Sequence, residues 1–226
     1  MKNSAFIFDL DGVIVDTATY HYLAWRRLAQ ELGFDFSEKE NERLKGVSRM
    51  QALDILLEIG NITLSEKEKK RLADRKNQWY VEYLQQLNQE SILPGSMSFL
   101  QAVRQMGIPS ALGSASKNAR TILDKLEITQ FFDAVVDGTM TTRAKPDPEV
   151  FLIGANLLRV SPDQCIVFED AQAGIDAALS AGMVPVGVGS SVDLKRAHLV
   201  IPSFKNMTPS DVLHQLGKPI QAPATS

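Results

Sequence analysis

The sequence predicts an α/β protein with a Rossmann-like parallel-sheet core domain and an inserted all-helical domain. Short apolar runs recur along the chain, and their lack of polar alternation is typical of strands buried on both faces. Periodic helical segments separate most of these runs, which is the order of a parallel sheet covered by helices. One interval, residues 17–91, contains helix signals and no convincing strand. The predicted strands are Ala5–Phe8, Ile108–Leu112, Ala134–Val136, Cys165–Phe168 and Val184–Val188.

Glycine and proline mark the predicted ends of helices. Glycine readily adopts the left-handed backbone that closes a helix. The glycines at such positions are Gly33, Gly60, Gly107 and Gly182. Asp147-Pro148 predicts a helix start, with the aspartate as N-cap and the proline at the first helical position.

The helical interval carries its own signals. Its first apolar stripe consists of Tyr20, Leu23, Ala24, Leu28 and Leu32. Capping-box spacing is found in Ser37-x-x-Glu40, Ser48-x-x-Gln51 and Ser65-x-x-Glu68. A last apolar stretch holds Leu72, Trp79, Tyr80, Tyr83, Leu84 and Leu87. These signals predict several packed helices.

We therefore predict two domains. Residues 17–91 form a helical cap domain, and residues 1–16 and 92–226 form the α/β core domain. The two connections, near Asp16 and Pro94-Gly95, would lie side by side and could act as a hinge. The segment after about residue 217, rich in Gly, Pro, Ala and Ser, is expected to be a loose tail.

Composition excludes several classes of protein. The 226 residues are 44% hydrophobic and 23% charged, which is ordinary for a globular protein of one large or two small domains. A net charge of −3 gives no basic field for nucleic acid or an anionic membrane. No signal peptide or membrane span is visible, so we expect a cytoplasmic protein. We also expect a monomer. The single cysteine, Cys165, is expected to be a buried strand thiol.

The first predicted strand ends in two carboxylates, Asp9 and Asp11, followed by Gly12. Residues two apart on a strand face the same side, so the pair would lie together. Two like charges at that separation are costly unless a cation, a proton or a substrate compensates them. The pair therefore indicates chemistry, although a polar turn with two solvated aspartates is the simpler alternative.

Three further strand ends carry reactive groups. Ser114 follows the second strand, Lys145 opens the segment before a helix, and Glu169-Asp170 follows the fourth strand. Ligand sites of open α/β sheets gather at the carboxyl ends of the strands. The carboxylates suit Mg²⁺, and a cation with Lys145 and Ser114 would complement a transferring phosphoryl group. A carboxylate could itself be the nucleophile.

This order of motifs resembles the haloacid dehalogenase superfamily of phosphotransferases over nearly the whole chain. The resemblance implies that Asp9 is the nucleophile and Asp11 the general acid/base, with Thr17 in the same first motif. It implies Mg²⁺ held by the Asp9 carboxylate, the Asp11 main-chain carbonyl and Asp170, assisted by Glu169. It also implies that Ser114 and Lys145 orient and neutralise the phosphoryl group. The helical interval resembles the mobile cap of that superfamily.

Segments of the cap and of the second core motif resemble the sugar-phosphate mutase branch of the superfamily. The segments are His21–Trp25, Leu44–Arg49, Arg75–Asn77 and Ser114–Asn118. The substrate-binding residues implied by this resemblance are Trp25, Leu44, Lys45, Gly46, Val47, Ser48, Arg49, Lys76, Ala115, Ser116, Lys117 and Asn118. The implied ligand is a small sugar phosphate.

The chemistry of a mutase explains these residue types. Its substrate must anchor a second phosphate, for which Arg49 offers a planar fork of donors and Lys117 an added charge. Gly46 permits close backbone approach, and the helix start at Ser48 favours an anion. Lys76 and Trp25 could line the sugar site. His21 could position Asp11 when the cap closes.

Simpler interpretations remain open for the cap. Trp25 could be a core aromatic, Lys76 part of a solvated helix face, and His21 a structural residue. Ala52 stands where the resemblance leads us to expect a substrate-contacting serine, which leaves the preferred sugar open. Two other functions compete: a sugar-phosphate phosphatase, in which water attacks phospho-Asp9, and a non-catalytic phospho-acceptor domain, which needs neither a lid nor Asp11.

Overall fold

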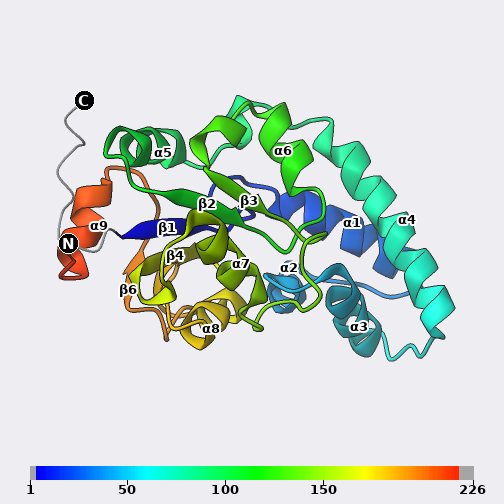
Figure 1. Cartoon of the computed structure of the whole chain (residues 1–226). Helices are drawn as coiled ribbons and strands as arrows, with labels where there is room; N and C mark the ends of the chain where they lie inside the picture. Colours follow the sequence, from blue (N-terminus) through cyan, green and yellow to red (C-terminus); the bar gives the residue numbers. More distant parts are fainter. Residues whose placement is uncertain (1–3, 219–226) are drawn as a thin grey trace.

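Six strands form one parallel sheet in the computed structural model, which describes residues 4–218 (Figure 1). The strand order is β3-β2-β1-β4-β5-β6. The strands are β1 Ala5–Phe8, β2 Ser110–Gly113, β3 Ala134–Val136, β4 Cys165–Glu169, β5 Val184–Val188 and β6 Leu199–Ile201. The predicted fold class is confirmed. Since β1 lies between β2 and β4, the sheet brings the carboxyl ends of these three strands together.

Two strand predictions need correction. The second strand begins at Ser110 instead of Ile108, because Ile108 still bonds back to the preceding helix through Val103 O. Strand β6, a three-residue edge strand that pairs with β5, was not predicted. A run this short is not distinguishable from a loop by its apolar pattern alone.

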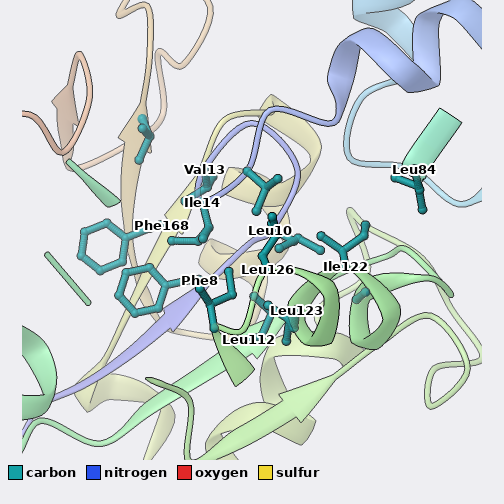
Figure 2. Packing of buried hydrophobic residues seen from close by; sticks show 14 of the residues in the cluster. Phe8, Leu10, Val13, Ile14, Leu84, Leu112, Ile122, Leu123, Leu126 and Phe168 are labelled. Atoms are coloured by element: carbon teal, nitrogen blue, oxygen red, sulfur yellow. The ribbon is translucent and has the colours of Figure 1, made fainter. Parts of the chain in front are cut away.

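Alternation along β1 builds two cores. Phe6 and Phe8 face a cluster with α5 (Ser96–Gln105), α6 (Ala119–Lys125) and α9 (Pro209–Gln215). Ala5 and Ile7 face the opposite cluster, with α7 (Glu149–Leu158) and α8 (Gln172–Ser180). In the first cluster the Phe8 ring stacks on Phe168 with centroids 4.8 Å apart (Figure 2). Burial of both sheet faces holds the strand ends rigidly in place.

The interval 17–91 is helical, as predicted, and contains no strand. It consists of α1 (Ala18–Glu31), α2 (Glu38–Asn41), α3 (Arg49–Ile59) and α4 (Glu66–Leu84), with short 3₁₀ turns at Glu42–Leu44 and Gln89–Ser91. Two further 3₁₀ turns, Thr129–Phe131 and Pro162–Gln164, belong to the sheet part. All three predicted capping boxes form at the starts of α2, α3 and α4. The predicted stripe is wrong at Leu23, which is 40% exposed while Trp25 is buried.

The two connections between the helical and sheet parts lie side by side. The Asp16 amide donates to Ser91 O at 2.8 Å, and the Leu93 amide donates to Ile14 O at 2.9 Å. Both connecting segments therefore pass between the two parts at the same place. The division into two domains that move about these connections stays a prediction.

The predicted helix ends are nearly all correct. Gly33, Gly107 and Gly182 follow α1, α5 and α8 with positive φ, and Gly60 caps α3. Helix α7 begins one residue later than predicted, with Pro148 at the cap position. Asp147 still accepts the Glu149 amide at 3.0 Å. The predicted loose tail lies almost entirely outside the described residues. None of the helices within residues 4–218 has the length and apolar character of a membrane span.

Candidate active site

A buried ion-pair cluster lies where β1 and β4 end. Lys145 Nζ donates to Asp9 Oδ1 at 2.6 Å and to Glu169 Oε1 at 2.5 Å. All three side chains are at most 7% exposed. Burial lowers the pKa of Lys145, but the two carboxylates outweigh it and the pKa is raised. Lys145 is therefore a fixed ammonium beside Asp9.

Asp9, Glu169 and Asp170 can together hold a metal ion, since one oxygen of each lies within 4.8 Å of the others. Two glycines leave room for these carboxylates. A Cβ on Gly12 would lie 2.2 Å from Asp170 Oδ2, and one on Gly174 would lie 1.9 Å from the Glu169 carboxylate. Burial, with the neighbouring carboxylates, raises the pKa of Glu169 to about 7 and that of Asp170 well above its usual range. Three carboxylates facing one lysine fit a divalent cation.

Asp11 points to different neighbours. The Thr17 hydroxyl donates to Asp11 Oδ1, and His21 Nε2 lies 3.8 Å from the same oxygen. Burial and the adjacent Asp9 charge raise the pKa of Asp11 to about 6. Its carboxylate is thus outside the carboxylate cluster, and ligation through its main-chain carbonyl stays a prediction. The two aspartates that the sequence placed together occupy two distinct environments.

His21 belongs to a second buried cluster, supplied by α1 and α4. Lys76 Nζ lies 2.9 Å from His21 Nδ1 and 4.4 Å from the centroid of the Trp25 ring. The Tyr80 ring stacks on His21 at 4.0 Å. Lys76 is 2% exposed, so its interpretation as a solvated residue is wrong. Burial, together with the charge of Arg49, lowers the pKa of Lys76 well below its usual range. Trp25 is both a core aromatic and part of this cluster.

The loop after β2 is ordered by its own hydroxyls. Ser114 is fully buried, and its Oγ accepts the Ser116 amide at 3.0 Å. Ser116 Oγ in turn accepts the Asn118 amide at 3.2 Å. The side chain of Lys117 is exposed. This loop therefore presents polar atoms from a fixed backbone toward the carboxyl edge of the sheet.

The loop before α3 closes on the sheet part. Gly46 has φ +71°, and a Cβ there would lie 2.9 Å from Ala171 Cβ, next to the carboxylate cluster of Glu169 and Asp170. Ser48 caps α3 and Arg49 is its first residue. Arg49 is half-buried, and burial lowers its pKa. Lys45 pairs with Glu42 at 2.9 Å. Helix α3 thus presents an N-terminus and a guanidinium at the same place.

One cavity of about 1160 Å³ joins these groups. Most of the predicted site residues line it: Asp9, Asp11, His21, Trp25, Leu44–Arg49, Lys76, Ala115–Asn118, Lys145 and Asp170. Thr17, Ser114 and Glu169 are fully buried and do not line it. Ala52 lines it with a methyl group, so the departure from serine falls inside the cavity.

Part of the cavity wall was not predicted from the sequence. Asn41, Asn77 and the segment 141–148 line the cavity, and Tyr80 supports His21 from behind. Asn77 was within reach of sequence reasoning, since it ends the Arg75–Asn77 segment. The segment 141–148 carried no signal besides Lys145, because its path depends on where α7 packs.

The comparison with known families decides the classification. A family described as haloacid dehalogenase-like hydrolase matches residues 4–182. The chain belongs to this family. The resemblance drawn from the strand-end motifs is confirmed.

Individual relatives agree over almost the full length. The chain is 43% identical to a β-phosphoglucomutase of Bacillus subtilis over 213 residues, covering 93% of this chain and 94% of the relative. It is 33% identical to a phosphorylated carbohydrates phosphatase of Thermotoga maritima, covering 94% and 97%. Among solved structures, a β-phosphoglucomutase from Clostridium difficile superposes with a TM-score of 0.91 at 47% identity, covering 95% and 97%. Both mutases and phosphatases are thus among the relatives.

Proposed function

We propose that this enzyme is a β-phosphoglucomutase, interconverting β-D-glucose 1-phosphate and glucose 6-phosphate through phospho-Asp9. One observation carries the proposal: a single cavity is lined by the Asp9–Lys145 pair and also by two further cationic residues, Arg49 and Lys117. A bisphosphate intermediate needs a binding place for each phosphate, whereas a monophosphate needs only one. The relatives named as β-phosphoglucomutases support the same function.

In the first half of the reaction, phospho-Asp9 transfers its phosphoryl group to the sugar. The C6 hydroxyl oxygen of β-glucose 1-phosphate attacks phosphorus, and the bond from phosphorus to Asp9 Oδ breaks. The Asp11 carboxylate takes the hydroxyl proton, which its raised pKa favours. The products are β-glucose 1,6-bisphosphate and free Asp9. Lys145 neutralises the charge beside Asp9 throughout.

The second half runs in the opposite sense after the bisphosphate turns around. The Asp9 carboxylate attacks the phosphorus on C1, and protonated Asp11 donates its proton to the departing C1 oxygen. Glucose 6-phosphate leaves and phospho-Asp9 is restored. In both halves Arg49 and Lys117 hold the phosphate that is not transferred. Atoms and protons balance over the cycle.

His21 and Lys76 give Asp11 its position. His21 lies 3.8 Å from Asp11 Oδ1, is stacked on Tyr80, and is contacted by Lys76 Nζ. Burial lowers the pKa of His21 well below its usual range, so a neutral ring faces Asp11. Since both residues come from the helical part, Asp11 is fully positioned only when that part closes over the sheet edge. Closure also excludes water, which competes with the sugar for phospho-Asp9.

Mg²⁺ is the metal we propose for the carboxylate cluster. Asp9, Glu169 and Asp170 would hold it, with the Asp11 carbonyl as a further ligand. When bound, it supplies positive charge that neutralises phosphate oxygens.

The test is an assay with β-glucose 1-phosphate, Mg²⁺ and a trace of β-glucose 1,6-bisphosphate, coupled to detection of glucose 6-phosphate. We expect steady isomerisation with little inorganic phosphate released. The phosphatase relative from Thermotoga maritima makes hydrolysis the second candidate. Release of phosphate from glucose 6-phosphate without isomerisation would favour it. If neither isomerisation nor hydrolysis is observed, the non-catalytic phospho-acceptor domain is the remaining alternative.

A further inference from the structure

A side-chain hydrogen bond joins the sheet part to the helical part beside the cavity. Asn118 Nδ2, at the start of α6, donates to Asn77 Oδ1 on α4 at 3.0 Å. Both residues are partly buried and both line the cavity. The bond therefore forms where the two parts meet and substrate is bound. None of the steps proposed above uses Asn77.

On the sheet side, the bond is anchored to the phosphoryl site. Asn118 is linked through its amide to Ser116 Oγ, and Ser116 is linked through its amide to Ser114 Oγ. An amide side chain has two N–H groups, so Asn118 can donate one to Asn77 and keep the other for a ligand. An anion bound by this loop would thus fix the Asn118 side chain that holds Asn77.

On the helical side, the bond is anchored to the group that positions Asp11. Asn77 directly follows Lys76, whose Nζ lies 2.9 Å from His21 Nδ1. Tyr80, about one turn further along α4, stacks on His21 and lies next to Ser116 and Thr17. Two residues of α4 therefore meet the Ser116–Asn118 loop, and the same helical turn holds His21.

We propose that Asn77 is a positioning residue that couples phosphate binding at the Ser114–Asn118 loop to the placement of His21 beside Asp11. Its acceptor oxygen holds α4 against the loop, so a phosphate that binds the loop and Asn118 strengthens the contact that keeps His21 beside Asp11. Phospho-Asp9 is then discharged faster to a sugar phosphate, whose second phosphate binds this loop, than to water, which has no such group. This inference rests on the proposed function, because it makes Asn77 one of the residues that favour a sugar phosphate over water as the acceptor of the phosphoryl group.

The experiment compares three variants of the full chain with Mg²⁺ present. Asn77→Ala removes the acceptor, Asn77→Asp keeps an oxygen at the same position, and Gln78→Ala changes an exposed neighbour on the same helix. The measured quantity is the ratio of isomerisation to inorganic phosphate release. We expect Asn77→Ala to lower this ratio about tenfold, Asn77→Asp to recover most of it, and Gln78→Ala to leave it unchanged. Thermal unfolding of each variant checks folding.

A ratio in Asn77→Ala equal to that of the wild type would overturn the proposal, as would an equal loss in Asn77→Ala and Asn77→Asp. A second measurement separates this failure from failure of the proposed function. The chain has three histidines, so the ¹⁵N signals of His21 can be followed by NMR. Inorganic phosphate should shift them in the wild type and in Asn77→Asp, and about tenfold less in Asn77→Ala. If the wild type does not isomerise, this shift still tests the coupling; equal shifts in all variants would refute it.

Discussion

The two buried charged clusters of this molecule are built in opposite ways. At the sheet edge, Lys145 is bonded to two carboxylates and its pKa is raised. In the helical part, Lys76 is equally buried but is bonded to neutral His21, and its pKa is lowered. Lys145 has two carboxylates in direct contact, whereas no carboxylate among residues 4–218 forms an ion pair with Lys76, on which Asp11 acts only from a distance. We therefore expect a negatively charged ligand, such as a sugar phosphate, to complete the helical cluster.

The largest effect is expected at Asp9. Asn cannot form a stable acyl phosphate, so Asp9→Asn should lower isomerisation by about 10⁴-fold or more. The coupled assay measures this, and intact-protein mass spectrometry checks that no phosphorylated species accumulates. Asp193→Asn, an exposed aspartate in the 190–194 turn, is the control and should match the wild type. Detection of phosphorylated protein in the Asp9→Asn variant would show that another residue is the nucleophile.

Replacing each of the two lysines with methionine tests whether the two clusters differ electrostatically. Lys145→Met leaves the Asp9 and Glu169 carboxylates buried without their cation and should lower the free energy of unfolding by about 3–5 kcal/mol. Lys76→Met removes a buried cation that has no carboxylate partner, so the free energy of unfolding should stay unchanged or rise by up to about 1 kcal/mol. Both variants should isomerise poorly.

Urea unfolding at neutral pH, without metal, measures the two lysine variants side by side. Lys195→Met, at an exposed position, is the control for the substitution itself. Equal destabilisation by Lys145→Met and Lys76→Met would show that the two lysines contribute equally to stability, and that the two clusters do not differ electrostatically.

Arg49 provides a smaller and more selective effect. Arg49→Ala should lower isomerisation by about 10²-fold, because the non-transferred phosphate loses a bidentate partner. Phosphorylation of Asp9 by a small acyl phosphate, which has no second phosphate, should change little. Arg49→Lys keeps the charge but loses the fork, and we expect an intermediate result. If both reactions fell equally, Arg49 would not hold the distal phosphate.

The two clusters also differ in how well the sequence predicted them. The sheet-edge residues follow from strand ends, because the carboxyl ends of adjacent parallel strands must meet. Lys76 was open to interpretation as a solvated residue because it lies in a charged run. Its spacing from Leu72, Ala73, Trp79 and Tyr80 nevertheless places it on the buried face of α4.

Three other features of the structure could not be predicted from sequence patterns. The three-residue strand β6 is stabilised by pairing with β5 and has no local signature. The cavity wall at 141–148 is set by hydrogen bonds such as those from Thr142 and Arg143 amides to Glu149. The Asn77–Asn118 bond joins residues 41 positions apart, so only the folded chain shows it.

The smallest effect concerns metal and pH at the sheet edge. The pKa of Asp11 is raised from 3.8 to about 6 and that of Glu169 from 4.5 to about 7. Across this window the folded chain keeps protons that the unfolded chain has released. Without metal, these groups therefore make the free energy of unfolding fall as pH rises from about 4 to about 7.

Adding Mg²⁺ should offset that loss, because the cation binds the ionised carboxylates. The increase in free energy of unfolding caused by Mg²⁺ should be about 1–2 kcal/mol near pH 7 and close to zero near pH 5. Asp170→Asn removes one ligand and should abolish most of this increase, while raising metal-free stability by about 1 kcal/mol. Asp193→Asn should retain both behaviours. A metal effect independent of pH would place the cation away from these carboxylates, and the negative charge of the sheet-edge cluster would then be balanced by Lys145 alone.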